Sequence, residues 1–185
     1  MTEHKHLTAK ELESGLDNIL ASPKNQGLIE LIVRRPAVNA REVISSGELD
    51  LQLGLVGDNW KSRGYRKTAD GSAHPEMQLN IMNSRVANLV AGNRDRWSLA
   101  GDQFYVDMDL SDQNLPAGTH LSLGEAIIEV TAEPHLGCKK FVTRFGQQAM
   151  MFVNSGLGKQ LNLRGINAKV VQAGRINTGD SLSKL

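Results

Sequence analysis

Apolar residues near the start of the chain recur at the spacing of a helix. Thr8 and Glu11 form the pattern of a capping box, and Ser22-Pro23 with the following Gly27 marks an end. We therefore predict an N-terminal helical extension over residues 1–26 that packs its apolar face on the rest of the molecule. That face consists of Leu12, Leu16, Ile19 and Leu20.

From residue 27 the pattern changes to short apolar or alternating runs separated by glycine, proline, asparagine and aspartate. Such runs are typical of strands, and their spacing favours a closed or nearly closed barrel. The fold prediction is thus a mainly β domain over residues 27–185 with helical insertions. The expected strands cover residues 28–34, 53–56, 78–82, 103–107, 120–123, 126–131 and 166–172.

Two helical insertions interrupt the β pattern. Ser84 is expected to cap a helix over residues 85–90 that ends at Gly92. A second helical stretch runs from residue 139 to residue 155, with a break near Gly146 and a stop at Gly156.

The composition changes this interpretation little. With 185 residues, 40% hydrophobic and 22% charged, the chain fits one domain with an appendage. A formal net charge of +1 gives no overall field that would attract nucleic acid or a membrane. The N-terminus lacks the pattern of a secretory signal, and no apolar run approaches the ~20 residues of a membrane span. We expect a cytoplasmic protein with neither kind of partner.

Cys138 is the only cysteine, so no intramolecular disulfide can form. It follows a predicted buried strand and precedes a helix, and the N–H groups and dipole at a helix start stabilise a thiolate. Gly137 lets the backbone approach a ligand closely. A small buried packing residue is the alternative interpretation. Positive potential around the sulfur would come from His135, Lys139, Lys140 and Arg144.

Asn83, Ser84 and Arg85 lie where a predicted strand enters a helix, and such a junction suits a phosphate or a polar heterocycle. Simple capping of the helix explains the same residues. Weaker candidates could together build a basic pocket opposite the cysteine, although their spacing does not show that they converge. These are Arg34-Arg35, Lys61-Ser62-Arg63, and Arg164 with Asn167.

A series of motifs in consistent order resembles the MOSC family, whose domains are named after the C-terminal part of molybdenum cofactor sulfurases. The resemblance runs from about Leu28 to Leu182. The motifs are Gly101-Asp102-Gln103, Val106-Asp107-Met108-Asp109-Leu110-Ser111, Asn114-Leu115-Pro116, Gly118, Glu129-Val130-Thr131, Pro134-His135, Cys138, Lys140-Phe141, Arg144-Phe145-Gly146 and Gly179-Asp180.

The resemblance implies a barrel-like β fold with a molybdenum-pterin cofactor, in which Cys138 is the protein thiolate on molybdenum. Relatives that are enzymes reduce N-hydroxylated compounds. The alternative is a sulfur-carrier module that bears a persulfide on Cys138 for metal-sulfur cluster or cofactor assembly. The expected cofactor-binding residues are Asn83, Ser84, Arg85, His135, Lys139, Lys140, Arg144 and Arg35.

The chain carries no second domain with cluster cysteines or an aminotransferase-like lysine, so it resembles a stand-alone member of that family. The expected partners are therefore an electron-donor or sulfur-donor protein and a small-molecule substrate.

Overall fold

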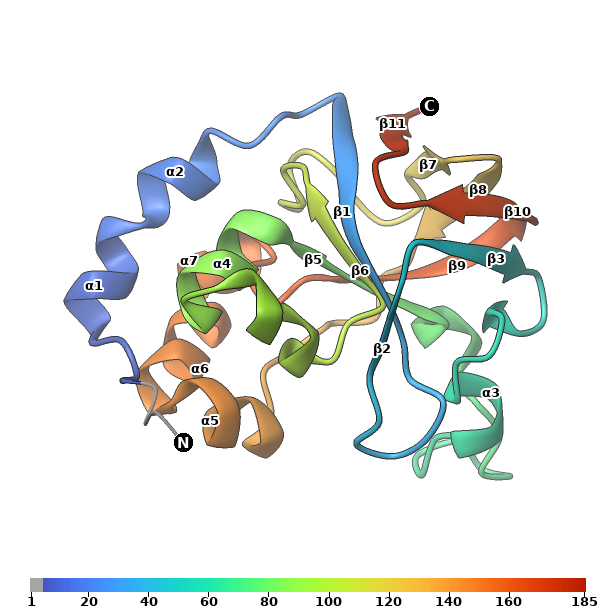
Figure 1. The fold of residues 1–185 in the computed structure, drawn as a ribbon, viewed down its shortest axis with the longest axis horizontal. Coiled ribbons are helices and arrows are strands. Elements are labelled where there is room, and N and C mark those ends of the chain that lie inside the picture. The colour runs from blue at the N-terminus through green and yellow to red at the C-terminus, as the bar shows by residue number, and fades with distance from the viewer. Residues whose placement is uncertain (1–4) are drawn as a thin grey trace.

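A closed seven-stranded barrel with helices against one side forms the centre of the molecule (Figure 1). The computed structural model describes residues 5–185. Going round the barrel, the order is β1-β11-β7-β8-β9-β5-β6 and back to β1. Only the β5–β6 pair is parallel in this ring. The strands are β1 (Gln26–Arg34), β5 (Leu79–Asn83), β6 (Phe104–Asp107), β7 (His120–Leu123), β8 (Ala126–Val130), β9 (Ile166–Gln172) and β11 (Ser181–Lys184).

The last strand closes the barrel. β11 pairs with β1 from Gln26↔Ser183 to Leu28↔Ser181, and with β7 on its other side. Because closure leaves no free sheet edge in the ring, the backbone groups of these strands are paired. Alternate residues point inward, as Ala126, Ile128 and Val130 do in β8. The predicted barrel class is confirmed.

Four shorter strands lie beside the barrel. The hydrophobic pattern missed three of them, over residues 42–44, 46–50 and 174–177, together with β11. β2 (Glu42–Ile44) pairs with the end of β1. β3 (Ser46–Asp50), β4 (Gly54–Leu55) and β10 (Gly174–Asn177) form a separate three-stranded sheet. The predicted strand over 53–56 shrinks to β4. These segments are short and largely exposed, so they carry little apolar alternation.

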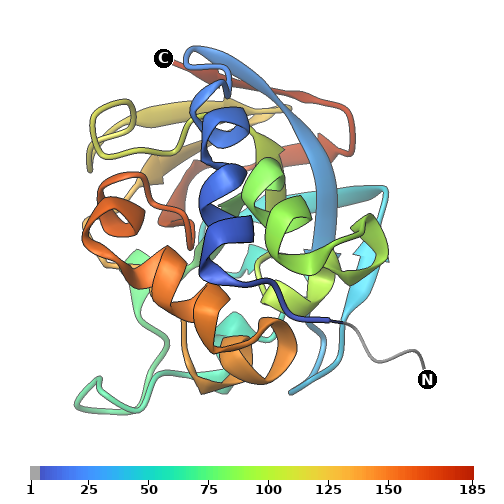
Figure 2. The same cartoon turned by 90° about the vertical axis from the view of Figure 1, so that its left-hand side faces the viewer.

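Most helices cover one side of the barrel, and Figure 2 looks onto this layer. α3 (Trp60–Arg63) and the short helix Pro75–Met77 lie elsewhere, in the long connection between β4 and β5. Among the described residues no helix is long and apolar enough to span a membrane. The helices of the layer are α1 (Ala9–Ser14), α2 (Leu16–Leu20), α4 (Ser84–Ala91), the 3₁₀ helix Arg94–Ala100, α5 (Lys139–Phe145), α6 (Gln147–Asn154) and α7 (Gly156–Gln160).

A second hydrophobic cluster joins this layer to the barrel. Leu12 of α1 is completely buried in it, together with Val86 of α4 and Phe145 of α5. The predicted capping box of Thr8 and Glu11 is present. The N-terminal helices therefore pack into the structure that carries α4 and α5.

Three local predictions are corrected. The first helix divides at Gly15, where a Cβ would lie 2.6 Å from the Leu89 side chain, so only glycine permits this close packing. Asn83, not Ser84, caps α4, because its Oδ1 accepts from the Arg85 N–H at 2.8 Å. Gly156 does not stop the helical stretch at 155, because Ser155 ends α6 and caps α7 at the same time.

Candidate functional site

Cys138 is the N-cap residue of α5 and is exposed to solvent. Its backbone is extended, with φ −125° and ψ 179°. The residue forms part of the wall of a pocket of about 310 Å³. Cys138 is therefore not the small packing residue of the alternative interpretation, and its sulfur is available to a ligand.

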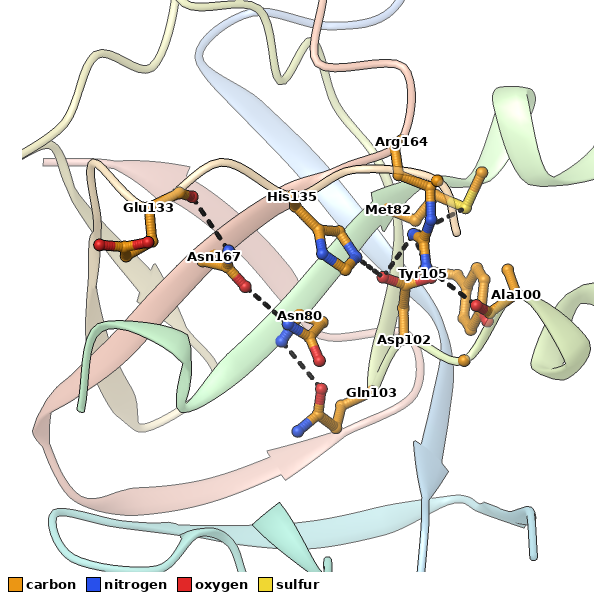
Figure 3. A network of polar contacts seen from close by, with 12 residues as sticks. Asn80, Met82, Ala100, Asp102, Gln103, Tyr105, Glu133, His135, Arg164 and Asn167 are labelled. Carbon is orange, nitrogen blue, oxygen red and sulfur yellow. Dashed lines mark hydrogen bonds and ion pairs between the residues drawn. The ribbon is translucent and has the colours of Figure 1, made fainter. Parts of the chain in front are cut away.

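The segment that leads to Cys138 is anchored at every second residue. Asn167 Nδ2 donates to the Glu133 carbonyl at 2.9 Å, and His135 Nε2 lies 2.7 Å from Asp102 Oδ1 (Figure 3). Asn154 pairs with both backbone groups of Gly137, accepting from its N–H at 2.8 Å and donating to its carbonyl at 3.1 Å. The three anchors give the cysteine a defined place although it lies in a loop.

Six cationic side chains line the pocket, and two of them are neutralised by buried carboxylates. Arg35 forms a two-pronged ion pair with Asp58, at 2.8 and 2.9 Å. Arg164 donates from Nη1 to both oxygens of Asp102, at 2.9 and 2.8 Å. These two pairs build the floor and add little net charge. The cations are Arg35, Arg41, Arg63, Lys140, Arg144 and Arg164.

The remaining four cations form no ion pair with any carboxylate among residues 5–185. Burial lowers the pKa of Arg41 from its ordinary value, and the charges of Arg144 and Arg35 lower it further. Burial likewise lowers the pKa of Arg63, with a contribution from Arg35. Unpaired positive charges that repel one another in a pocket favour an anionic ligand.

The side chains of Arg41 and Arg144 approach each other beside Gly101. A Cβ on this glycine would lie 3.4 Å from Arg41 Nη2 and 3.9 Å from Arg144 Nη1. Both guanidinium groups therefore reach the same small volume beside the Gly101 backbone. Because an arginine fork matches phosphate or carboxylate oxygens, this volume suits one oxyanion.

The buried Asp102 and Arg164 and the partly buried His135 form a polar network at the pocket (Figure 3). Burial by itself raises the pKa of Asp102, but the charges and hydrogen bonds of Arg164 and His135 reverse this and hold it at about 2. Burial lowers the pKa of His135, and repulsion from Arg164 adds to it, while Asp102 acts in the opposite direction. At neutral pH the aspartate is charged and the imidazole is neutral.

The structure brings together five of the predicted site residues. Arg35, His135, Cys138, Lys140 and Arg144 all line the one pocket. Arg63 and Arg164, weaker candidates in the sequence, line it too, so the basic pocket suggested by them exists.

The other predicted site residues lie elsewhere. Lys139 is exposed and does not line the pocket. Asn83 and Ser84 are buried at the start of α4, where Asn83 caps the helix. Arg85 pairs with Asp107 at 2.7 Å. Asn83 therefore serves the helix start and Arg85 an ion pair, and none of the three lines the pocket with Cys138.

Sequence reasoning missed Arg41, Asn59 and the two carboxylates that hold the pocket arginines. Asp102 stood in a motif, but nothing in the motif pointed to His135 or Arg164. Asn59 Oδ1 is buried without a hydrogen-bond partner among the described residues, and Asn59 also lines the pocket.

No group of three or more histidine, cysteine or acidic side chains in residues 5–185 is arranged to hold a metal ion. Cys138 can thus supply one protein ligand, and the other ligands of a metal would have to come with a cofactor. An exposed thiol beside unpaired guanidinium groups fits an anionic, metal-bearing cofactor of this kind.

The fold is that of a MOSC-like domain. YuaD from Bacillus subtilis matches with a TM-score of 0.60 and 17% identity, over 85% of this chain and 94% of that chain. YiiM from Escherichia coli matches with a TM-score of 0.55 and 18% identity, over 85% and 69% of the two chains. YiiM from Geobacillus stearothermophilus matches with a TM-score of 0.58 and 14% identity, over 86% of this chain and 75% of that chain. No family model and no curated protein sequence matches the chain.

Proposed function

We propose that this protein binds a molybdenum-pterin cofactor in the pocket that contains Cys138 and reduces N-hydroxylated compounds there. The observation that carries the proposal is the position of an exposed thiol and four unpaired cations in one pocket of about 310 Å³. A soft thiolate suits a cofactor-borne metal, and the arginines suit a phosphate. The MOSC-like fold supports this pairing of thiol and cationic pocket.

The pocket residues divide the work of holding such a cofactor. Arg41 and Arg144 would take the phosphate beside Gly101, where their guanidinium groups converge. Arg63 and Lys140 add charge at the wall. Cys138 would be the protein ligand of the metal. When bound, the cofactor supplies the two-electron chemistry that the side chains lack.

A partner protein must provide the electrons, because no described side chain of the pocket stores them. The site does not extend to Asn83, Ser84 and Arg85, which do not line the pocket, and the side chains of Asn83 and Arg85 are already engaged at the start of α4. The proposed substrates are small molecules with an N–OH group.

The test is to express the chain in a host that makes the cofactor, and to measure molybdenum, labile sulfur and benzamidoxime reduction. Wild type should carry about one molybdenum per chain, and Cys138→Ala should lose both the metal and the activity. Labile sulfur on wild type without molybdenum would instead indicate a persulfide carrier, which the exposure of Cys138 also permits. Equal results for both proteins would refute a role of the cysteine.

Two variants that each remove one positive charge distinguish an effect on the phosphate site from an effect of the net charge. Arg63, the last residue of α3, lines the pocket, and its side chain has no hydrogen-bond partner in the described residues, whereas Arg66, three residues further on, is exposed and does not line the pocket. Arg63→Gln should weaken phosphate binding about tenfold, which corresponds to about 1.4 kcal/mol. Arg66→Gln should leave it within about twofold. Equal losses would mean that the pocket is not the phosphate site.

A further inference from the structure

We infer that His135 is the proton donor for the ligand in the Cys138 pocket, and that Asp102 sets the ring nitrogen from which the proton leaves. This inference rests on the proposed function, because it assigns a residue to the reduction. It requires that His135 reach the pocket, that one ring nitrogen be fixed, and that the other be open.

The first requirement is met by position. His135 lines the pocket that Cys138, Arg41 and Arg144 also line. It also lines a second pocket of about 470 Å³, on the side of Leu136 and Gly165. His135 thus lies in the wall between two spaces, and its side chain keeps 14% of its surface exposed, enough for proton exchange with water.

The second requirement is met by the partners of Asp102. Arg164 already donates to both carboxylate oxygens, and the carboxylate is ionised, so it can only accept. His135 Nε2, 2.7 Å from Oδ1, must therefore carry a hydrogen and donate it. In the neutral imidazole the hydrogen is then absent from Nδ1.

The third requirement concerns Nδ1. It has no hydrogen-bond partner in residues 5–185, and it is not among the fully enclosed unpaired polar atoms. Figure 3 shows one ring nitrogen directed at Asp102 and the other turned away from it. A proton added to His135 therefore goes to Nδ1, the nitrogen that a ligand or water can approach.

The charges around the imidazole ring determine the pH at which His135 becomes protonated. Arg164 and Arg35 oppose protonation, and Asp102 favours it. Since burial also disfavours the charged form, the imidazolium becomes populated only as the pH falls below 6.5, the ordinary pKa of histidine. The other titratable groups of the two pocket walls are Arg41, Arg63, Tyr65, His74, Cys138, Lys140 and Arg144 in the first, and Asp112, Glu133 and Lys159 in the second.

Reduction of an amidoxime breaks the N–O bond and consumes two electrons and two protons, giving an amidine and water. The electrons come from the donor protein. His135 gives its Nδ1 proton to the departing hydroxyl oxygen, which leaves as water, and the second proton reaches the nitrogen from solvent. The imidazole, neutral again, takes up one H⁺ from the solvent before the next turnover, so each cycle consumes two electrons and two protons and forms one amidine and one water.

The first test needs no cofactor. Nitrogen-15 NMR of the histidine rings in the purified chain should show His135 as the neutral Nε2–H form at pH 7.5, with a midpoint of protonation below 6.5. A predominant Nδ1–H form, or a midpoint above 6.5, would overturn the inference.

The second test uses the loaded enzyme, with benzamidoxime as substrate and reduced methyl viologen as electron donor. In wild type kcat should rise as the pH falls below 6.5 and then level off. His135→Gln keeps an amide donor for Asp102 but cannot titrate, so kcat should fall about 100-fold and the inflection should vanish. Added imidazole should restore part of the rate. His120→Gln, which alters an exposed histidine beside Glu129 outside both pockets, is the matched control.

The outcomes distinguish the two proposals. A loaded His135→Gln variant that keeps the rate and the inflection overturns the proton transfer alone. The same holds if the inflection disappears with His74→Gln instead. A wild-type protein that binds no molybdenum refutes the proposed function, and the proton transfer in this reaction with it, whatever tautomer NMR finds.

Discussion

The side chain of Asn154 pairs with both backbone groups of Gly137, the residue before Cys138, at 2.8 and 3.1 Å. Asn154 is the last residue of α6, and Gly137 precedes α5, so a helix end holds the loop much as a neighbouring strand would. A Cβ on Gly137 would lie 3.3 Å from Asn154 Nδ2, which explains why the smallest residue occupies this place.

Replacing Asn154 with alanine should therefore loosen the cysteine segment. Loss of two hydrogen bonds, with the Gly137 groups left to water, should lower the free energy of unfolding by about 1–3 kcal/mol. Urea unfolding measures this, and alkylation of Cys138 should become faster in the folded protein. Asn88→Ala is the control, since Asn88 is exposed on α4 and its side chain makes no hydrogen bond within residues 5–185. It should change stability by less than about 0.5 kcal/mol. Similar effects of both changes would contradict an anchoring role.

Gly101 offers a way to block the oxyanion volume without removing a charge. Its φ is +96°, and a Cβ there would project toward Arg41 and Arg144. Gly101→Ala should cost about 1–2 kcal/mol of stability through backbone strain and should also weaken phosphate binding. Calorimetry of phosphate binding checks the second effect.

Gly118→Ala is the matched control for this change, because Gly118 has φ +88° and open space where the Cβ would go. It should lose similar stability and keep the phosphate affinity. If both variants bind phosphate as wild type does, the anion does not lie between Arg41 and Arg144.

The Asp102–Arg164 pair should appear in the pH dependence of stability. Asp102 has a folded pKa of about 2 against an ordinary value of 3.8. Because the folded value is the lower one, its stabilising contribution is complete above pH 3.8 and is lost as the pH falls toward 2. Asp102→Asn should destabilise the protein by about 3–5 kcal/mol at pH 7, since it leaves the Arg164 charge buried without its partner.

Urea midpoints measured from pH 7 to pH 2.5 would test this. The gap between wild type and Asp102→Asn should be constant above pH 4 and should narrow below it. Asp95→Asn alters an exposed carboxylate, so it should change the urea midpoint little at any pH in this range. A gap that does not depend on pH would mean that Asp102 is not ionised in the folded protein.

Strands β7 and β8 show where the sequence pattern was sufficient to predict the bounds of a strand. The alternation of Leu121 with Leu123, and of Ala126 with Ile128 and Val130, predicted β7 to the residue and β8 to within one. Such strands have one buried face, and burial imposes the period of two. β11 and β10 were missed because they are four-residue strands with a single buried side chain each, Leu182 and Ile176, so no alternation marks them.

The predicted site residues also fall into two groups, those that line the pocket and those that do not. His135 and Lys140 could be chosen because they lie within a few residues of Cys138 in the chain, but Lys139, its immediate neighbour, does not line the pocket, so closeness in sequence is not sufficient. Asn83, Ser84 and Arg85 are also polar or cationic residues that could bind an anion. However, the Asn83 side chain caps α4 and the Arg85 side chain forms an ion pair with Asp107. Residue types reveal which bonds a group can form, not which of the available partners takes them.

The sequence by itself determined the barrel class, the capping box of the first helix and the place of Cys138 at a helix start, since strand runs, caps and helix starts each leave a local pattern in the chain. Only the tertiary structure decided that Arg35, Arg41, Arg63, Arg144 and Arg164 meet around that cysteine, and that Asp58 and Asp102 neutralise two of them. The physical reason is that charge in a pocket depends on distances and burial, which arise when segments far apart in the chain pack together.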